Sequence, residues 1–257
     1  LTAALCADGG YLVHGLDSDA ANVESAREHI RGLGLYGKVS VEQFTSDRLP
    51  YADNLVNLLV EDDLGVSMDE AMRVLVPNGV AYIKGVRWEK TVKPRPDEID
   101  EWTHFLHGPD NNAVAHDSVV DVPRRMQWLG GPKFARAHEQ LASLSACVTT
   151  GGRLFYIIDE TPRADVRFPS KWFLVARDAF NGVVLWKRSI PTWMDQLRNF
   201  RSGPAGTVFR LAAKDNLVYV TLGADAPVSI LDAATGRTLA TCKGTENARQ
   251  ILRLDDK

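Results

Sequence analysis

The sequence predicts an α/β unit over residues 1–95 and an all-β unit over residues 96–257. In the first part, short apolar runs alternate with stretches whose apolar residues recur at helical spacing, as in α/β folds. In the second part, short alternating runs are separated by Gly, Asn and Asp, which indicates antiparallel strands. Residues 87–101 are charged, contain Pro94 and Pro96, and break both patterns, so we expect a linker there.

The composition is that of a globular protein with no bias toward nucleic-acid or membrane partners. Of the 257 residues, 45% are hydrophobic and 25% are charged, and the net charge is -3. A charge balance this close to neutral predicts neither a nucleic-acid nor a membrane-surface partner. No apolar run approaches the roughly 18 residues that a membrane span needs, so we expect no membrane span.

Both ends of the sequence predict a fragment of a longer protein. The chain starts at Leu1 with a pattern typical of the end of a helix, which Gly9 and Gly10 terminate. Residues 250–257 begin a new apolar alternation that stops before a partner strand appears. Because the sequence does not start with Met, it predicts no compartment.

The cysteines predict free thiols. Cys6, Cys147 and Cys242 are widely spaced and form no CxxC pair or haem-attachment motif. This spacing supports neither a disulfide framework nor a cysteine metal site. We expect these residues to be buried as small apolar side chains.

The first part of the chain alternates strands and helices. Val23, Ala26 and Ile30 recur at helical spacing, and Ser67 with Glu70 fits the capping box that starts a helix. The predicted elements are, in order, a strand over residues 11–17, a helix over 19–33, strands over 38–44 and 55–60, a helix over 67–75 and a strand over 80–84.

This order is that of a doubly wound α/β unit whose first strand and Gly-rich turn lie before Leu1. Ligands of such sheets bind at the carboxyl ends of the strands. The residues at these ends are Asp17, residues 45–47 and residues 61–63.

Three motifs in this part resemble those of class I methyltransferases that use S-adenosylmethionine, in particular the type 11 group. They are GLDSD at residues 15–19, DRLPYADNLVNLLV at residues 47–60 and EAMRVLVPNGVAYIKG at residues 70–85. The resemblance covers about residues 1–86 and implies an incomplete Rossmann-like methyltransferase domain. An acceptor for the methyl group is not identified.

The resemblance also implies five cofactor-binding residues, Asp17, Ser18, Thr45, Ser46 and Glu61. Asp17 would accept hydrogen bonds from the ribose hydroxyls, and Thr45 and Ser46 would border the adenine ring. Glu61 would lie near the methionine end of the cofactor. The alternatives are structural, because Asp17 can simply cap the next helix and the other residues can be solvated loop residues.

The second part contains two similar runs of four predicted strands. Each run has a turn that starts with Asp and ends with Gly before its last strand, DAFNG at residues 178–182 and DAATG at residues 232–236, 54 residues apart. The predicted strands cover residues 144–149, 154–158, 172–177 and 183–190, and then residues 209–213, 217–222, 228–231 and 237–241.

These runs resemble the blades of PQQ-like, quinoprotein-type β-propellers. WFLVARDAFNGVVLWK at residues 172–187 is similar to the family's repeat including Trp186, whereas SILDAATGRTLAT at residues 229–241 has Ala240 in the Trp position. The resemblance implies propeller blades that recognise a substrate or a protein partner, with further blades outside this sequence. The sequence has no vicinal cysteines and no haem motif, both typical of redox-active quinoproteins. A bound PQQ and a redox role are therefore the weaker expectation.

Histidines gather between the two parts. His104 and His107 could share one helix face, which would allow a metal site. No recognised ligand spacing covers the whole set, however, and nearby aromatic residues favour packing, so the sequence predicts no metal ligand. The set consists of His104, His107, His116 and His138 with Asp100, Asp110 and Asp117 between them.

Two functional hypotheses follow from the sequence. The first is an enzyme that transfers a methyl group from S-adenosylmethionine, in which the protein mainly aligns the nucleophile with the methyl group. The second is a non-catalytic binding protein in which the α/β unit is a scaffold and the blades are the interaction platform.

Overall fold

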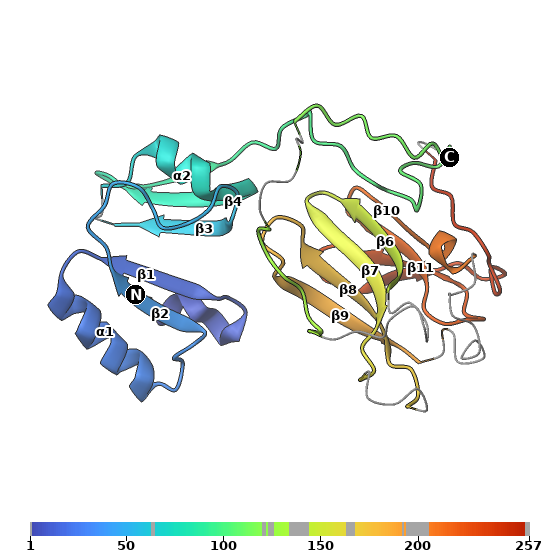
Figure 1. The fold of residues 1–257 in the computed structure, drawn as a ribbon, viewed down its shortest axis with the longest axis horizontal. Coiled ribbons are helices and arrows are strands. Elements are labelled where there is room, and N and C mark those ends of the chain that lie inside the picture. The colour runs from blue at the N-terminus through green and yellow to red at the C-terminus, as the bar shows by residue number, and fades with distance from the viewer. Residues whose placement is uncertain are drawn as a thin grey trace. The chain divides into compact units, whose positions relative to one another are not determined.

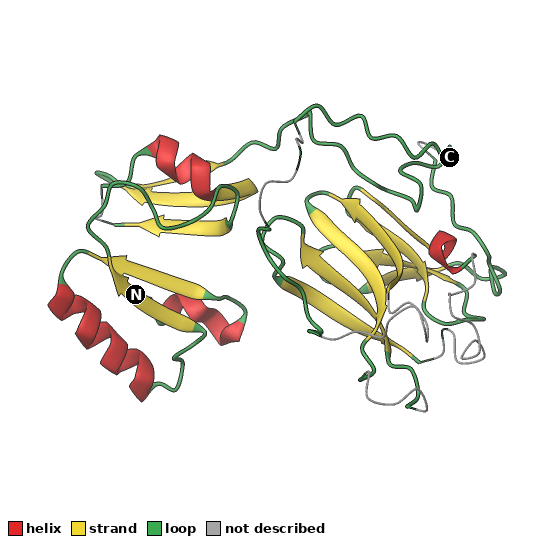
Figure 2. Ribbon diagram, viewed as in Figure 1, coloured by secondary structure: helices red, strands yellow, loops and turns green. Residues whose placement is uncertain are grey.

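The computed structural model describes residues 2–62, 65–119, 122, 126–133, 144–162, 168–191, 193 and 206–254. The chain divides into two compact units, Leu1–Pro94 (unit 1) and Arg95–Lys257 (unit 2). Figure 1 shows the course of the chain through both units, and Figure 2 shows that strands predominate over helices. The division lies close to residue 95, where the hydrophobic pattern of the sequence changes.

The first sheet of unit 1 is a parallel pair. It is preceded by a short 3-10 helix, Ala4–Gly9, and consists of β1 (Val13–Asp17) and β2 (Val39–Gln43), joined by helix α1 (Ala20–Gly32). Asp19 starts this helix because its side chain accepts a hydrogen bond from the amide of Ala21 at 2.7 Å. One face of the helix then packs on the pair, in a core of Cys6, Val23, Ile30, Val39 and Val41.

The second sheet of unit 1 has three strands. β3 (Val56–Glu61) pairs in parallel with β4 (Leu75–Lys84), which pairs antiparallel with β5 (Trp88–Val92). Helix α2 (Met68–Val74) connects the first two strands and is capped by Ser67, whose hydroxyl accepts from the amide of Glu70 at 3.2 Å.

Strand β5 corrects the prediction of a linker over residues 87–101. Its backbone pairs with β4 from Val80 to Lys84, and beyond the strand the amide of Lys93 still donates to the carbonyl of Gly79. The charges and prolines of this stretch led to the prediction of a linker in place of a strand. Trp88, Glu89 and Lys90 lie on an exposed edge, where charged residues are tolerated.

Arg73 of helix α2 holds the long connection between β2 and β3 in place. Its guanidinium group donates to Glu70 and to Asp53, each at 2.6 Å, and to the carbonyl of Tyr51 at 2.8 Å. The hydroxyl of Tyr51 in turn lies 2.9 Å from Nδ1 of His14 on β1. His14 is therefore an exposed strand residue with a partner in this connection.

The surroundings of Tyr51 shift the pKa of its phenol. Burial, with a further contribution from the charge of Glu42, raises the pKa of Tyr51 to about 12. The phenol is thus neutral at physiological pH and keeps its hydrogen bond to His14.

The structure corrects the predicted fold class. The described residues hold thirteen strands and two α-helices, and the strands form four separate sheets of two to four strands. A doubly wound α/β unit needs a continuous, mostly parallel sheet with helices on both faces. Because no described strand joins β1–β2 to β3–β4–β5, the Rossmann-like unit followed by propeller blades is wrong as the fold class of this chain.

Unit 2 contains two antiparallel four-stranded sheets, each with its strands in chain order. The Asp178 and Asp232 turns occupy equivalent places, since each joins the third and fourth strands of its sheet. The first sheet comprises β6 (Leu144–Thr150), β7 (Arg153–Asp159), β8 (Trp172–Asp178) and β9 (Val184–Ile190), and the second comprises β10 (Leu211–Lys214), β11 (Leu217–Thr221), β12 (Val228–Asp232) and β13 (Thr238–Thr241).

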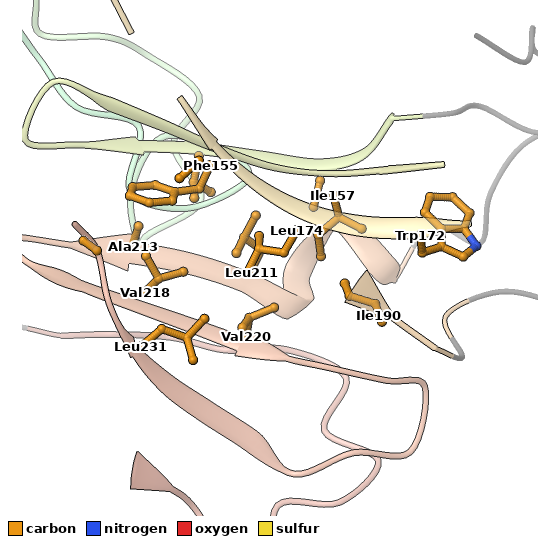
Figure 3. Packing of buried hydrophobic residues seen from close by; sticks show 14 of the residues in the cluster. Phe155, Ile157, Trp172, Leu174, Ile190, Leu211, Ala213, Val218, Val220 and Leu231 are labelled. Carbon is orange, nitrogen blue, oxygen red and sulfur yellow. The ribbon is translucent and has the colours of Figure 1, made fainter. Parts of the chain in front are cut away.

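The two sheets share one hydrophobic core. Phe155 and Leu174 of the first sheet and Leu211 and Leu231 of the second belong to one buried cluster, and each is at most 1% exposed. Figure 3 shows these side chains directed toward one another from the two sheets. At the far side of the second sheet, β13 is the terminal strand and all four of its residues are exposed.

The same tryptophan contact occurs at both Asp turns. The indole N–H of Trp186 donates to the carbonyl of Ala233 at 2.9 Å, and the indole N–H of Trp128 donates to the carbonyl of Ala179 at 3.1 Å. Gly236 lies directly under the Trp186 ring with φ of +70°, and a Cβ there would come within 2.6 Å of the ring. The glycine is required both for the backbone conformation and for the close approach.

A short irregular segment joins the inner edges of the two sheets. The carbonyl of Trp102 accepts from the amide of Thr149 on β6 at 2.7 Å, and the next carbonyl, of Thr103, accepts from the amide of Ala213 on β10 at 2.9 Å. The carboxylate of Glu101 also accepts from the amide of Gly151 at 2.6 Å. Residues 101–103 therefore lie against both sheets at their first strands.

Candidate functional site

The structure brings four of the five predicted cofactor-binding residues to one edge of unit 1. Asp17 ends β1 and lies opposite Gln43, the last residue of β2. The amide of Phe44 donates to the carbonyl of Asp17 at 2.9 Å, so Thr45 and Ser46 leave the sheet at the same edge. All of these residues lie at the carboxyl end of a parallel pair, as predicted.

The carboxylate of Asp17 already has partners in the chain. Its Oδ1 accepts from the amide of Asp19 at 2.8 Å, and its Oδ2 lies 3.3 Å from the side-chain nitrogen of Asn22. Asp17 therefore helps to shape the start of helix α1, while Asp19 caps it. An ionised carboxylate has about four acceptor sites, so these contacts leave capacity for a further donor.

Ser18 and Ser46 have backbone-related contacts of their own. The carbonyl of Ser18 accepts from the side-chain amide of Gln43 at 3.1 Å. The hydroxyl of Ser46 accepts from the amide of Arg48 at 3.2 Å, which fixes the turn after β2. Thr45 and Ser46 are exposed.

Glu61 belongs to a different sheet. It ends β3, is only 8% exposed, and its Oε1 accepts from the amide of Gly65 at 2.8 Å. This contact closes the loop that follows β3. Among the described residues no contact joins Glu61 to Asp17, so the structure does not bring the fifth predicted residue to the first four.

A second group of polar residues gathers in unit 2. Asp100, His107 and His116 each offer one ligand atom, and these atoms lie within 4.8 Å of one another. Nε2 of His107 lies 2.7 Å from Oδ2 of Asp100, and the rings of His107 and His116 meet edge to face with centroids 5.0 Å apart. We call these three residues the Asp–His cluster.

The Asp–His cluster is held by backbone hydrogen bonds. The amides of His116 and Glu101 donate to the two oxygens of Asp100, at 2.6 and 2.7 Å. Burial alone would raise the pKa of Asp100, but these two amides and the His107 side chain together lower it. The carboxylate is therefore ionised at neutral pH.

His104 does not belong to this cluster. His104 and His107 do not share a helix face, the arrangement that would have allowed a joint metal site, because the two residues form an antiparallel bridge in an irregular segment. His104 is 3% exposed, its Nε2 accepts from the amide of Arg253 at 3.1 Å, and burial lowers its pKa. It is a neutral structural residue. His138 lies outside the described residues.

An apolar hollow lies beside the irregular segment. It has a volume of about 400 Å³ and is open to solvent. Cys147 lines it from β6 and is exposed, which corrects the expectation of a buried thiol, and Phe105 packs edge to face on Phe209 with ring centroids 5.3 Å apart. Its lining includes Trp102, Phe105, Leu144, Cys147 and Val208.

Sequence reasoning noticed the histidines but did not predict their grouping. The three cluster residues are separated by seven and nine positions, and no single helix or strand would place all three on one face. The available signal was the density of His and Asp around an irregular segment. The backbone path of residues 100–116 brings Asp100, His107 and His116 together, and the sequence does not predict this path.

Across the described ranges, no helix is both long and apolar enough to cross a membrane. Comparison with models of protein families finds no match to the chain, and comparison with the curated proteins finds none either.

Proposed function

We propose that this chain is a non-catalytic binding protein in which unit 2 recognises a protein partner. The observation that carries the proposal is the apolar hollow on a rigid support. The hollow rests on strand β6, whose sheet shares a buried core with the second sheet. Its wall residues Trp102 and Phe105 are each more than one third exposed although they are aromatic. Exposed aromatic side chains around a depression are typical of binding surfaces.

The size and chemistry of the hollow fit an apolar side chain of a partner. A volume of about 400 Å³ lies near the lower end of ligand pockets, which span roughly 300–1,000 Å³. Two adjacent groups, the Ser145 and Thr149 hydroxyls, are polar, and the latter accepts from the amide of Trp102. The lining thus offers mainly contact area and few free polar groups.

The test uses 1-anilinonaphthalene-8-sulfonate as an apolar probe. We expect saturable fluorescence enhancement with one probe per native chain, and at least a tenfold weaker affinity in Val208→Asp, because the new carboxylate would enter the hollow. Val114→Asp, at a position 56% exposed in the same unit, is the matched control and should leave the affinity unchanged. Absence of saturable binding, or equal affinity in Val208→Asp, contradicts the proposal.

A second candidate function is the binding of S-adenosylmethionine, with transfer of its methyl group to an acceptor that is not identified. The observation that favours it is the carboxylate of Asp17 at the end of parallel strand β1, next to the Thr45–Ser46 turn. A carboxylate on a strand end can accept from both ribose hydroxyls.

Calorimetric titration with S-adenosylhomocysteine separates the two candidates. Binding that is lost by about ten- to a hundredfold in Asp17→Ala, but retained in Asp69→Ala, would support the second candidate. Asp69 is an exposed carboxylate on helix α2 and serves as the control. If the native chain gives no heat at millimolar ligand, the second candidate fails and the first is untouched.

A further inference from the structure

We propose that the Asp–His cluster binds a divalent transition-metal ion, with Zn²⁺ as the best match, through Asp100 Oδ2, His107 Nε2 and a ring nitrogen of His116. The ligand atoms of these three residues lie within 4.8 Å of one another, and the described residues contain no other group of three His, Cys, Asp or Glu ligands this close. Two imidazoles and one carboxylate form a donor set that zinc and related ions prefer.

The distances require only a small rearrangement. Zinc lies about 2.0–2.2 Å from nitrogen and oxygen ligands, so two ligands of a tetrahedral ion are roughly 3.3 Å apart. His107 Nε2 and Asp100 Oδ2 are 2.7 Å apart, which is a hydrogen bond. An ion entering the cluster would take the place of the shared proton and widen this separation by about half an ångström.

The surroundings prepare two of the ligands for this role. The side chains of His107 and Asp100 are 11% and 19% exposed, and the two oxygens of Asp100 accept from the amides of Glu101 and His116. The ring of Trp102 packs edge to face on His107, with centroids 5.7 Å apart, and the hydroxyl of Thr103 donates to the His107 carbonyl at 3.3 Å. These contacts fix the position of the imidazole, as groups around metal ligands commonly do.

His116 supplies the exposed side of the site. Its ring lies against the edge of His107 but faces solvent, whereas its amide is fixed on Asp100. An ion held by these three residues would have one face covered by protein and one open to water. Three protein ligands and an open position are the arrangement that accepts an exogenous ligand.

The alternative is an Asp100–His107 hydrogen-bonded pair that needs no ion, and the test separates the two. The full chain, first treated with a chelator, is titrated with Zn²⁺ by calorimetry and with Co²⁺ by visible absorption. We expect one ion per chain and the absorption bands of tetrahedral or five-coordinate Co²⁺, which a hydrogen-bonded pair cannot produce.

Two variants and one control complete the experiment. His116→Ala removes an exposed ligand without disturbing the core, and we expect about a hundredfold weaker Zn²⁺ binding, since even outer-shell changes cost 10- to 100-fold. Asp100→Asn should abolish the Co²⁺ bands. His29→Ala, an exposed histidine on helix α1, should change neither. If the native chain binds no ion stoichiometrically, or if His116→Ala binds as tightly as the native chain, the Asp–His cluster is not a metal site and the proposal is wrong.

Discussion

At the scale of single residues, a tryptophan contact links the two sheets of unit 2 at the Asp232 turn. Trp186 comes from the last strand of the first sheet, and its indole donates to a turn of the second. Arg188, two residues later, donates to the carbonyl of Gly236 at 2.9 Å on the same turn. One strand therefore supplies both an aromatic ring and a cation to the turn of its neighbour, and this joins the two sheets.

We predict that Trp186→Ala lowers the free energy of unfolding of unit 2 by about 2–4 kcal/mol, because a half-buried indole loses its packing and its hydrogen bond. Gly236→Ala should also be destabilising, since the added Cβ would meet the ring and the backbone has φ of +70°. Urea unfolding followed by circular dichroism measures both. Trp88→Ala, at a position 47% exposed on β5, is the control and should change stability by less than about 0.5 kcal/mol.

At the scale of elements, Arg73 on helix α2 ties the β2–β3 connection to the second sheet of unit 1. The guanidinium donates to Glu70 through two nitrogens, and the amide of Leu49 donates to Glu70 Oε1 at 2.7 Å. The hydrogen bond from Arg73 is the largest cause of a lowered pKa at Glu70. Helix α2 thus holds the β2–β3 connection through Arg73 and Glu70, and these contacts require the Glu70 carboxylate to be ionised.

The sign of the resulting pH dependence follows from linkage. The pKa of Glu70 is lower in the folded chain than its unfolded value of about 4.3, so its contribution to stability is complete above that value. The contribution is lost as the pH falls through the folded pKa. We therefore expect the melting temperature of unit 1 to drop below about pH 4, and this part of the drop to be missing in Glu70→Gln. If the melting temperature of Glu70→Gln follows the same pH profile as that of the native chain, Glu70 does not have this role.

The elements were also the part that the sequence predicts best. The helix over residues 20–32 and strands β6 to β9 follow directly from periodicity and turn residues, because these signals are local. Which strands share hydrogen bonds is not local information. The order of elements in unit 1 suggested one sheet, and the structure has two, since β1 and β3 have no described strand between them.

At the scale of the whole molecule, the sites also differ in whether local sequence signals predict them. Asp17 and Thr45 could be predicted to lie together because both follow the ends of strands that pair in parallel. Glu61 could not be assigned correctly, because its sheet is separate from theirs. The Asp–His cluster depends on an irregular path from residue 100 to residue 116, for which no periodic signal exists.

The terminal strand β13 has a consequence for the colloidal behaviour of the protein. Its outer edge has no neighbouring strand among the described residues, and its sequence, Thr-Leu-Ala-Thr, carries no charge. Natural sheets commonly protect such edges with lysine, proline or a bulge on the outer strand. We expect concentrated solutions to form dimers and larger species through strand-to-strand pairing at β13, detectable by light scattering. Leu239→Lys should suppress this association while the melting temperature stays the same, and association that persists in the variant would place the contact elsewhere.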